Sequence, residues 1–397
     1  MPRSDDNQHP VPLPAIGRGE VDPAESAEPP DQSEAPAESG RQLAPNSPDV
    51  QREIDALIET VTAGDASNAD QRLVRDLITA ALKLIPDGRD TGELKLMTAA
   101  VKELRYAFRI FGQYPDPRKV SIFGSSRTPA GHPDYETAVE FSRQMAGRGW
   151  MVITGAGGGI MQAGHEGPGR GASFGVAIRL PFEQETNEII RGDEKLVNFR
   201  YFFTRKVMFL SQSDAVVCFP GGFGTLDEAF ETLTLIQTGK AAMVPLVLMD
   251  GEDAGEGHSY WNAFVAFLRE QLLRRGMIDE ADLGLFHLAS GPEDAAEHIC
   301  QFYRNYESYR YVRDDLVISI KRPLTAASME KLNDEFGVLV AEGSIQPSGP
   351  YEVETRHRDL PRIAFTHTRR DYGLVRRLID RINTLPTEEA NAVPEGR

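Results

Sequence analysis

Between residues 119 and 306 the chain alternates short apolar runs with longer amphipathic stretches, and this alternation restricts the fold more than any other feature. Strands that alternate with helices form βαβ units, whose strands lie parallel in one sheet covered on both faces. The pattern therefore predicts an α/β fold with a doubly wound parallel sheet. Its expected strands are 120–123, 151–154, 174–180, 215–219, 246–249 and 286–289, and its expected helices lie near 134–147, 160–167, 199–212, 226–238, 260–274 and 293–306.

The sequences on either side of this sheet domain, which is expected to span 118–308, predict three further segments. Residues 1–49 contain ten acidic residues, three arginines, ten of the 26 prolines and no aromatic residue, a composition that predicts a disordered tail. Helical spacing of apolar residues predicts an N-terminal helical segment over 50–117. Residues 309–397 predict a small α/β accessory unit with strands at 316–320, 351–355 and 363–366 and helices at 326–340 and 372–385.

The net charge of −17 and the composition exclude several classes of protein. An acidic chain argues against a broad nucleic-acid surface, although local backbone dipoles still allow it to bind a small anion. The longest apolar stretch, near 241–249, is about half the roughly 20 residues of a membrane span, so we expect no span. The N-terminus lacks the apolar region of a signal peptide, so we expect none there. Two distant cysteines and eight scattered histidines predict no disulfide framework and no metal site, and we expect a cytoplasmic protein.

Three of the expected strand-to-helix turns are rich in glycine or serine. They are Phe-Gly-Ser-Ser-Arg at 123–127, Thr-Gly-Ala-Gly-Gly-Gly-Ile-Met at 154–161 and Phe-Pro-Gly-Gly-Phe-Gly-Thr-Leu-Asp-Glu at 219–228. Glycine lets backbone N–H groups approach an anion, and the helix that follows adds a partial positive charge. One such turn is as readily explained by a tight connection, but three at one edge of a sheet favour a nucleotide site.

The spacing of these glycines argues against the common nucleotide cofactors. The dinucleotide fingerprint GxGxxG needs a glycine where Ile160 stands, and an acidic residue after the next strand, which ends near Arg179. NAD is therefore disfavoured, and NADP, which can use an arginine, is disfavoured less strongly. The Walker pattern GxxxxGK[ST] is absent, which argues against ATP hydrolysis.

Thr225 and Glu228 in the third turn have two interpretations. Thr225 is expected to cap the helix, so Glu228 three residues later would complete a capping box. Alternatively, Glu228 is a carboxylate beside a bound nucleotide, where it stabilises the oxocarbenium-like state of glycosidic cleavage or activates water. Arg205, on an otherwise apolar helix, is either an ordinary ion-paired arginine or the partner that orients Glu228 and holds substrate oxygens.

These residues resemble the LONELY GUY (LOG) family over roughly 118–308. The run at 220–228 matches the family signature PGGxGTxxE. Arg205-Lys206 followed by Met208 is similar to the family's arginine-lysine helix, at the family's spacing from the glutamate. The turns at 154–161 and 124–126 resemble its TGGGPGIME-type loop and its first-strand turn.

The resemblance implies a Rossmann-like fold, usually dimeric, that needs no cofactor. It also implies hydrolysis of the N-glycosidic bond of nucleoside 5'-monophosphates such as AMP, which yields free base and ribose 5-phosphate. By carry-over from the family, Arg205 and Glu228 form the catalytic pair. The residues expected to bind substrate are Gly221, Gly222, Gly224, Thr225, Gly157, Gly158, Ser125 and Lys206. The preferred base stays open among purines, pyrimidines and cytokinin bases.

Three residues depart from the family's loop: Ala156, Gly158 and Gln162 stand where glycine, proline and glutamate are common. Ala156 is expected to narrow the space for backbone approach to the substrate. The alternative function is a non-catalytic nucleotide sensor of the same superfamily, which would not need both Arg205 and Glu228. Related sequences also carry the label lysine decarboxylase, but nothing here marks a lysine as the Schiff base of pyridoxal phosphate.

Overall fold

The computed structural model describes residues 44–62, 68–179, 186–251, 259–351, 354 and 357–388. It divides into two compact units, residues 1–89 and residues 90–397. Most of the expected tail at 1–49 lies outside the described residues, and the first helix already begins at Pro48. The division before residue 90 places the third helix of the expected 50–117 segment with the sheet, because that helix contacts the strand at Leu196–Phe199.

The first unit contains two helices, α1 (Pro48–Thr62) and α2 (Asn68–Lys83). An ion pair between Arg75 and Asp55 joins them, together with a hydrogen bond of 3.0 Å from Gln51 Nε2 to Thr79 Oγ1. Several apolar side chains of the two helices stay exposed, among them Leu57, Val61, Leu73, Val74 and Leu77.

The second unit is built on a seven-stranded parallel sheet, as the alternating pattern predicts. The sheet order is β4-β3-β2-β1-β5-β6-β7. The six expected strands are confirmed, whereas β4 was missed because its residues precede the helix expected at 199–212. The bounds are β1 (Lys119–Phe123), β2 (Met151–Thr154), β3 (Ser173–Ile178), β4 (Leu196–Phe199), β5 (Ala215–Cys218), β6 (Leu246–Met249) and β7 (Phe286–Ala289).

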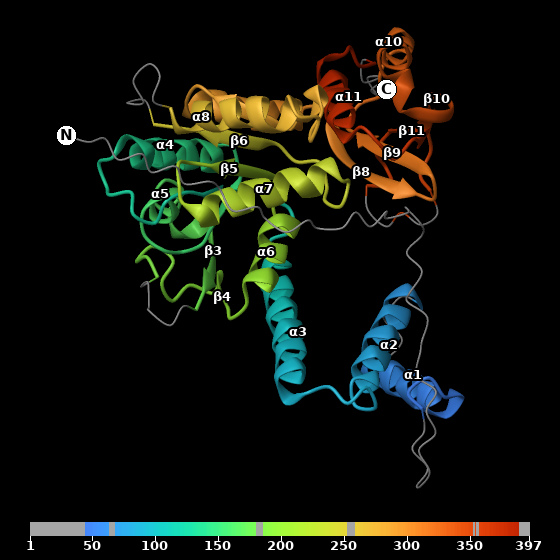
Figure 1. Ribbon diagram of the computed structural model, residues 1–397. Helices are drawn as coiled ribbons and strands as arrows, with labels where there is room; N and C mark the ends of the chain where they lie inside the picture. The colour runs from blue at the N-terminus through green and yellow to red at the C-terminus, as the bar shows by residue number, and fades with distance from the viewer. Residues whose placement is uncertain are drawn as a thin grey trace, which may run out of the picture. The chain divides into compact units, whose positions relative to one another are not determined.

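Helices cover both faces of this sheet (Figure 1). One face shares an apolar core with α4 (Pro133–Gly147), α5 (Ile160–Glu166) and α9 (Pro292–Phe302). The other shares a core with α3 (Thr91–Phe111), α6 (Phe202–Ser211) and α8 (Tyr260–Phe267), and α7 (Phe223–Gln237) contributes to both cores. Among the described residues, no helix is long and apolar enough to cross a membrane.

The strand order places a topological switch point between β1 and β5. From β1 the chain adds β2, β3 and β4 in one direction, and it then returns to add β5, β6 and β7 in the other. Connections that diverge in this way leave an open crevice at the carboxyl ends of the two strands, where ligands of such sheets bind. The turns that follow β1 and β5 are two of the three glycine- or serine-rich turns.

The C-terminal residues form a second, four-stranded antiparallel sheet of order β10-β11-β9-β8. The strands expected at 316–320 and 363–366 and the helix expected at 372–385 are confirmed. The bounds are β8 (Tyr306–Val312), β9 (Asp315–Ile320), α10 (Ala326–Phe336), β10 (Val340–Ser348), β11 (Arg362–His367) and α11 (Tyr372–Thr384).

Three expectations for this region were wrong. The helix expected at 293–306 ends at Phe302, and β8 takes over from residue 306. The helix expected to reach residue 340 ends at Phe336, because a 3₁₀ turn begins at Gly337 and the chain then enters β10. Tyr351 and Glu354, the described residues of the strand expected at 351–355, belong to no strand, and the Glu354 N–H donates to the Tyr351 carbonyl oxygen (3.1 Å).

The two sheets of the second unit share one apolar core. Leu316 and Ile318 of β9 and Leu378 of α11 belong to the same cluster of buried side chains as Val120 of β1. The C-terminal sheet is therefore packed on the parallel sheet rather than attached by a loose linker.

Asn383 in the last turn of α11 adds polar contacts to this junction. The residue is 3% exposed, and its Oδ1 accepts hydrogen bonds from the backbone N–H groups of Asn305 (2.8 Å) and Tyr306 (2.9 Å). Its Nδ2 donates to the carbonyl oxygen of Phe302. One side chain thus satisfies three backbone groups between α9 and β8.

Replacing Asn383 with leucine is expected to lower the free energy of unfolding by about 2–4 kcal/mol, because buried backbone groups lose their partners. Urea unfolding followed by circular dichroism measures this change. Thr384→Ala is the matched control, since the neighbouring Thr384 is exposed, and it should shift stability by no more than about 0.5 kcal/mol. Equal effects of the two substitutions would contradict the role given to Asn383.

Candidate active site

The three glycine- or serine-rich turns meet at the switch point of the parallel sheet. The backbone N–H of Ser125, after β1, donates to the carbonyl oxygen of Pro220, after β5 (3.0 Å). The Ser125 carbonyl oxygen in turn accepts from the N–H of Ile160, at the start of α5 (3.0 Å). Ser125 therefore links the turn after β1 to both of the others.

Two glycines permit this close approach. A Cβ atom on Gly159, which has a φ of +62°, would collide with the Ser125 carbonyl oxygen. A Cβ atom on Gly221 would collide with Thr225 Oγ1 and would lie 3.1 Å from the Ser125 nitrogen. At Gly222 and Gly224 the neighbourhood is open, because an added Cβ would meet nothing within 4 Å. The turn after β5 thus borders free space at these two residues.

Helix α7 begins at this turn, but not with the expected cap. Gly222 is the N-cap residue and makes no side-chain cap hydrogen bond, while Thr225 lies inside the first helical turn. The prediction that Thr225 caps the helix was therefore wrong, because the glycines let the helix start earlier. The capping box does not form either: Glu228 Oε2 is buried and has no hydrogen-bond partner. The N–H groups of Thr225 and Leu226 donate to the Gly222 carbonyl oxygen (3.1 and 3.2 Å), so those of Phe223 and Gly224 are the N–H groups of α7 left for another acceptor.

Arg205 of α6 and Glu228 of α7 lie together beside this turn. Arg205 Nη2 is 3.9 Å from Glu228 Oε1, and the two side chains are 16% and 4% exposed. The guanidinium also lies against the rings of Phe202 and Phe209, at 5.1 Å and 5.6 Å from their centroids. Two buried polar atoms of the pair, Arg205 Nε and Glu228 Oε2, have no hydrogen-bond partner among the residues that the structure describes. The pair therefore retains hydrogen-bonding capacity that a bound ligand can use.

Burial shifts the protonation equilibrium of Glu228 toward the neutral form. Burial raises the pKa of Glu228 to about 7, although Lys206 and Arg205 act in the opposite direction. Burial likewise lowers the pKa of the Arg205 guanidinium, while Glu228 acts to raise it. A carboxyl group with a pKa near the working pH can both accept and release a proton.

Comparison with known proteins identifies relatives of the region that carries this pair. Residues 157–299 match the protein family described as "Possible lysine decarboxylase". The chain is 26% identical over 196 residues to the probable cytokinin riboside 5'-monophosphate phosphoribohydrolase LOGL2 of Oryza sativa subsp. japonica, which covers 48% of this chain and 75% of the relative. It is 30% identical over 167 residues to LOG6 of Arabidopsis thaliana, described in the same words, which covers 41% of this chain and 77% of the relative. This chain belongs to the LOG family.

Among solved structures, this LOG-family chain is similar to a molybdenum cofactor binding protein from Rippkaea orientalis. The two are 17% identical with a TM-score of 0.34, and the match covers 47% of this chain and 97% of the other.

Lys206, expected to bind substrate in this LOG-family protein, is occupied by neighbouring carboxylates. Its Nζ lies 2.8 Å from Asp227 Oδ2 and 2.6 Å from Glu231 Oε2, both on α7. These ion pairs raise the pKa of Lys206, although burial acts against them. The contacts tie α6 to α7 and so help to hold Arg205 opposite Glu228.

Hydrogen bonds from Asn187, outside the three turns, hold the second turn (154–161) in place. Asn187 Nδ2 donates to the carbonyl oxygen of Gly157 (3.0 Å), and the Asn187 N–H donates to that of Ala156 (2.9 Å). Ala156 has a left-handed φ of +63°, and its side chain is buried in a small cluster with Ala177 and Ile190. The expectation that Ala156 narrows the space at the site was wrong, because its methyl group packs into this wall.

Two further residues at this edge of the sheet carry no motif and were missed. Tyr260 of α8 donates from Oη to the carbonyl oxygen of Gly221 (2.8 Å), so it holds the turn after β5 from the other side. Asp250, directly after β6, accepts from the Ser259 hydroxyl and keeps its Oδ1 buried without a partner. In the part of the chain that the structure describes, no group of three His, Cys, Asp or Glu side chains could hold a metal ion.

The raised pKa of Glu228 predicts how stability depends on pH. The folded state holds the proton more tightly than the unfolded state, whose carboxyl pKa is near 4.5. The stabilisation that protonated Glu228 gives the folded state is therefore fully present below pH 4.5 and is lost as the pH rises to about 7. Glu228→Gln keeps the neutral form at every pH, so its stability relative to the unchanged protein should rise across this window, by on the order of 3 kcal/mol.

Urea unfolding at pH 5 and at pH 8 measures this difference. Glu231→Gln is the matched control, since Glu231 lies on the same helix and is paired with Lys206. If Glu228→Gln and Glu231→Gln change the unfolding free energy by the same amount between the two pH values, burial of Glu228 is not the cause of the pH dependence.

Proposed function

We propose that this protein hydrolyses the N-glycosidic bond of nucleoside 5'-monophosphates, with release of free base and ribose 5-phosphate. The observation that carries the proposal is the buried Arg205–Glu228 pair, with one unpartnered polar atom on each side chain. The pair lies beside a turn whose glycines and uncapped helix suit a phosphate. The curated relatives support the proposal, since LOGL2 and LOG6 are both described as probable phosphoribohydrolases of a nucleoside 5'-monophosphate.

In the proposed complex, the 5'-phosphate lies against the turn after β5. The N–H groups of Gly222 and Gly224 and the hydroxyl of Thr225 would donate to its oxygens, and the N-terminal end of α7 would contribute its partial positive charge. Gly157, Gly158 and Ser125 line the neighbouring turns that the backbone hydrogen bonds bring to the same place. This arrangement explains how an acidic chain can bind a dianion, because the attraction is local.

The ribose would then lie next to the catalytic pair. Ionised Glu228 would stabilise the positive charge that develops on the anomeric carbon, and it can accept a proton from the attacking water. The water oxygen forms the new bond to that carbon, and the base leaves with the electron pair of the glycosidic bond. Arg205, held by two aromatic rings, would orient the carboxylate and bind sugar oxygens.

We take AMP as the first substrate to test, together with GMP, CMP, UMP and a cytokinin riboside monophosphate. Release of free base is followed by chromatography. We expect turnover of at least one of them, and we expect Glu228→Gln to lower kcat by about 10²–10⁴-fold. Arg205→Gln should have a similar effect, whereas Lys240→Ala, at an exposed position, should leave the rate unchanged.

The same experiment separates hydrolysis from the alternative of a nucleotide sensor. Calorimetric titration of the folded protein with each monophosphate measures binding independently of turnover. Tight binding without release of any base would identify a sensor, and it would overturn the catalytic roles of Arg205 and Glu228 together.

We also propose that the protein forms a homodimer through the face next to this site. Large apolar side chains stay exposed there on α3, α6 and α7, namely Tyr106, Phe108, Phe202, Phe203, Val207 and Phe223. A hydrogen bond of 2.7 Å from Thr204 Oγ1 to Glu103 Oε2 fixes α6 to α3. Phe223, in the turn itself, is 93% exposed. Exposed apolar patches of this kind mark protein contacts.

Placing two charges in this face should separate the copies. The double variant Phe203→Glu/Val207→Glu is expected to halve the molar mass measured by light scattering after gel filtration. Met277→Glu is the control, because Met277 is exposed but lies outside the face. A monomeric unchanged protein, or a dimer that survives the double variant, would contradict the proposal.

A further inference from the structure

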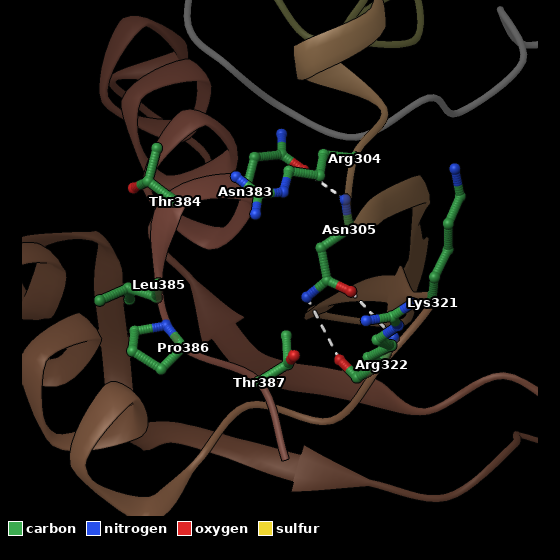
Figure 2. A pocket seen from close by; sticks show the side chains of 9 residues that line it. All are labelled: Arg304, Asn305, Lys321, Arg322, Asn383, Thr384, Leu385, Pro386 and Thr387. Atoms are coloured by element: carbon green, nitrogen blue, oxygen red, sulfur yellow. Dashed lines mark hydrogen bonds between the residues drawn. The ribbon is translucent and has the colours of Figure 1, made fainter. Parts of the chain in front are cut away.

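A polar cavity lies away from the turns of the candidate active site. Its volume is about 490 Å³, and three segments of the chain enclose it: residues 304–305 after α9, residues 321–322 after β9 and residues 383–387 at the end of α11 (Figure 2). None of these residues belongs to the three turns or to the catalytic pair. The volume falls within the range of about 300–1,000 Å³ that is typical of small-molecule sites.

The charge of this cavity is opposite to that of the chain. Three of its nine lining residues are cationic, namely Arg304, Lys321 and Arg322, and none of the nine is acidic. The chain as a whole carries −17. Such a local reversal of sign concentrates anions at one place on an otherwise repelling surface.

The two arginines are available to a ligand, whereas the lysine is partly used. Lys321 Nζ donates to the Tyr303 carbonyl oxygen and lies 3.8 Å from Glu307 Oε2. The guanidinium groups of Arg304 and Arg322 form no ion pair with any carboxylate of the described residues. Other arginines of the second unit do have such partners, as in the pairs Arg118–Asp214, Arg148–Glu293, Arg362–Glu354 and Arg381–Glu335.

The backbone that carries both arginines is held in place. Asn305, which is 4% exposed, donates from Nδ2 to the Arg322 carbonyl oxygen (3.2 Å), and its Oδ1 accepts from the Arg322 N–H (2.8 Å). The Asn305 N–H donates to Asn383 Oδ1 (2.8 Å), and Figure 2 shows these contacts along one wall. Arg304 precedes Asn305 directly, so the attachment points of the two guanidinium groups are fixed relative to each other.

We propose that this cavity binds a small phosphorylated molecule with two or more negative charges, which Arg304 and Arg322 hold together. A guanidinium group presents a planar fork of N–H donors that matches two phosphate oxygens at once. Two such forks on a fixed backbone suit a pair of phosphate groups, and the nearby Lys321 adds to the field. The proposal does not depend on the proposed hydrolysis, because the two sites share no residue.

Hydrogen–deuterium exchange of the full chain with inorganic pyrophosphate tests the location. Added pyrophosphate should slow exchange in peptides that contain 304–305, 321–322 and 383–387, at constant ionic strength. In the double variant Arg304→Ala/Arg322→Ala this protection should disappear. The affinity of the site for pyrophosphate, measured by calorimetry, should fall at least tenfold. Because both side chains are exposed, the variant should fold, and Arg304→Gln/Arg322→Gln provides a second variant that keeps most of the side-chain length.

The control variant is Lys240→Ala/Arg275→Ala, which removes the same charge from exposed positions and should keep the protection. Protection confined to peptides around 219–228 would show binding at the active site alone and would overturn the proposal. Protection that persists in the Arg304/Arg322 variants would overturn it as well. Citrate serves as a polycarboxylate probe, and equal protection by citrate would overturn the assignment to phosphoryl groups.

Discussion

The site of this protein depends on the backbone of one residue, Ser125. Its N–H and carbonyl groups join the turn after β1 to the turns on either side, and this junction lies where the parallel sheet switches direction. Such an approach of three backbones is possible only where no side chain intervenes, which explains glycine at positions 159 and 221. Once the turns are joined, the sheet places the first turns of α6 and α7, and Arg205 and Glu228 come to face each other.

The pair itself works against stability. A carboxyl group that is 4% exposed, with one oxygen unpartnered, costs free energy whenever it is ionised. Apolar packing elsewhere offsets this cost, because both faces of the sheet are packed and the C-terminal sheet extends one of the two cores. Strain and unsatisfied groups that persist in a well-packed protein tend to gather at functional sites. The unpartnered atoms of Glu228 and Arg205 and the left-handed Ala156 in the second turn gather at the proposed site.

Local sequence rules failed where tertiary contacts or glycine overrode them. Thr225 has a side chain that is typical of helix caps, and Glu228 stands at the spacing of a capping-box partner. Helix α7 nevertheless begins three residues earlier, because Gly222 and Gly224 let the chain enter the helix without a side-chain cap. Strand β4 is short and only partly buried, so its apolar alternation is too weak to separate from the helix that follows. In the C-terminal unit, Val338 and Leu339 continue the spacing of α10, but Gly337 ends the helix and β10 pairs with β11 instead. Tyr260 and Asp250 belong to no pattern, and only their contacts show their position at the site.

The sequence by itself determined the class of fold, because the period of its apolar residues changes from helix to strand and back in a way that only a parallel α/β sheet satisfies. It also identified the residues of the candidate site, through the glycine-rich turns and the arginine and glutamate that accompany them. The tertiary structure decided what those residues do to one another. The distance from Arg205 to Glu228, the burial that raises the pKa of Glu228, the capture of Lys206 by α7 and the cavity between Arg304 and Arg322 all join segments far apart in the chain. Burial and charge pairing across such distances depend on how the helices and strands pack, and no local pattern encodes them.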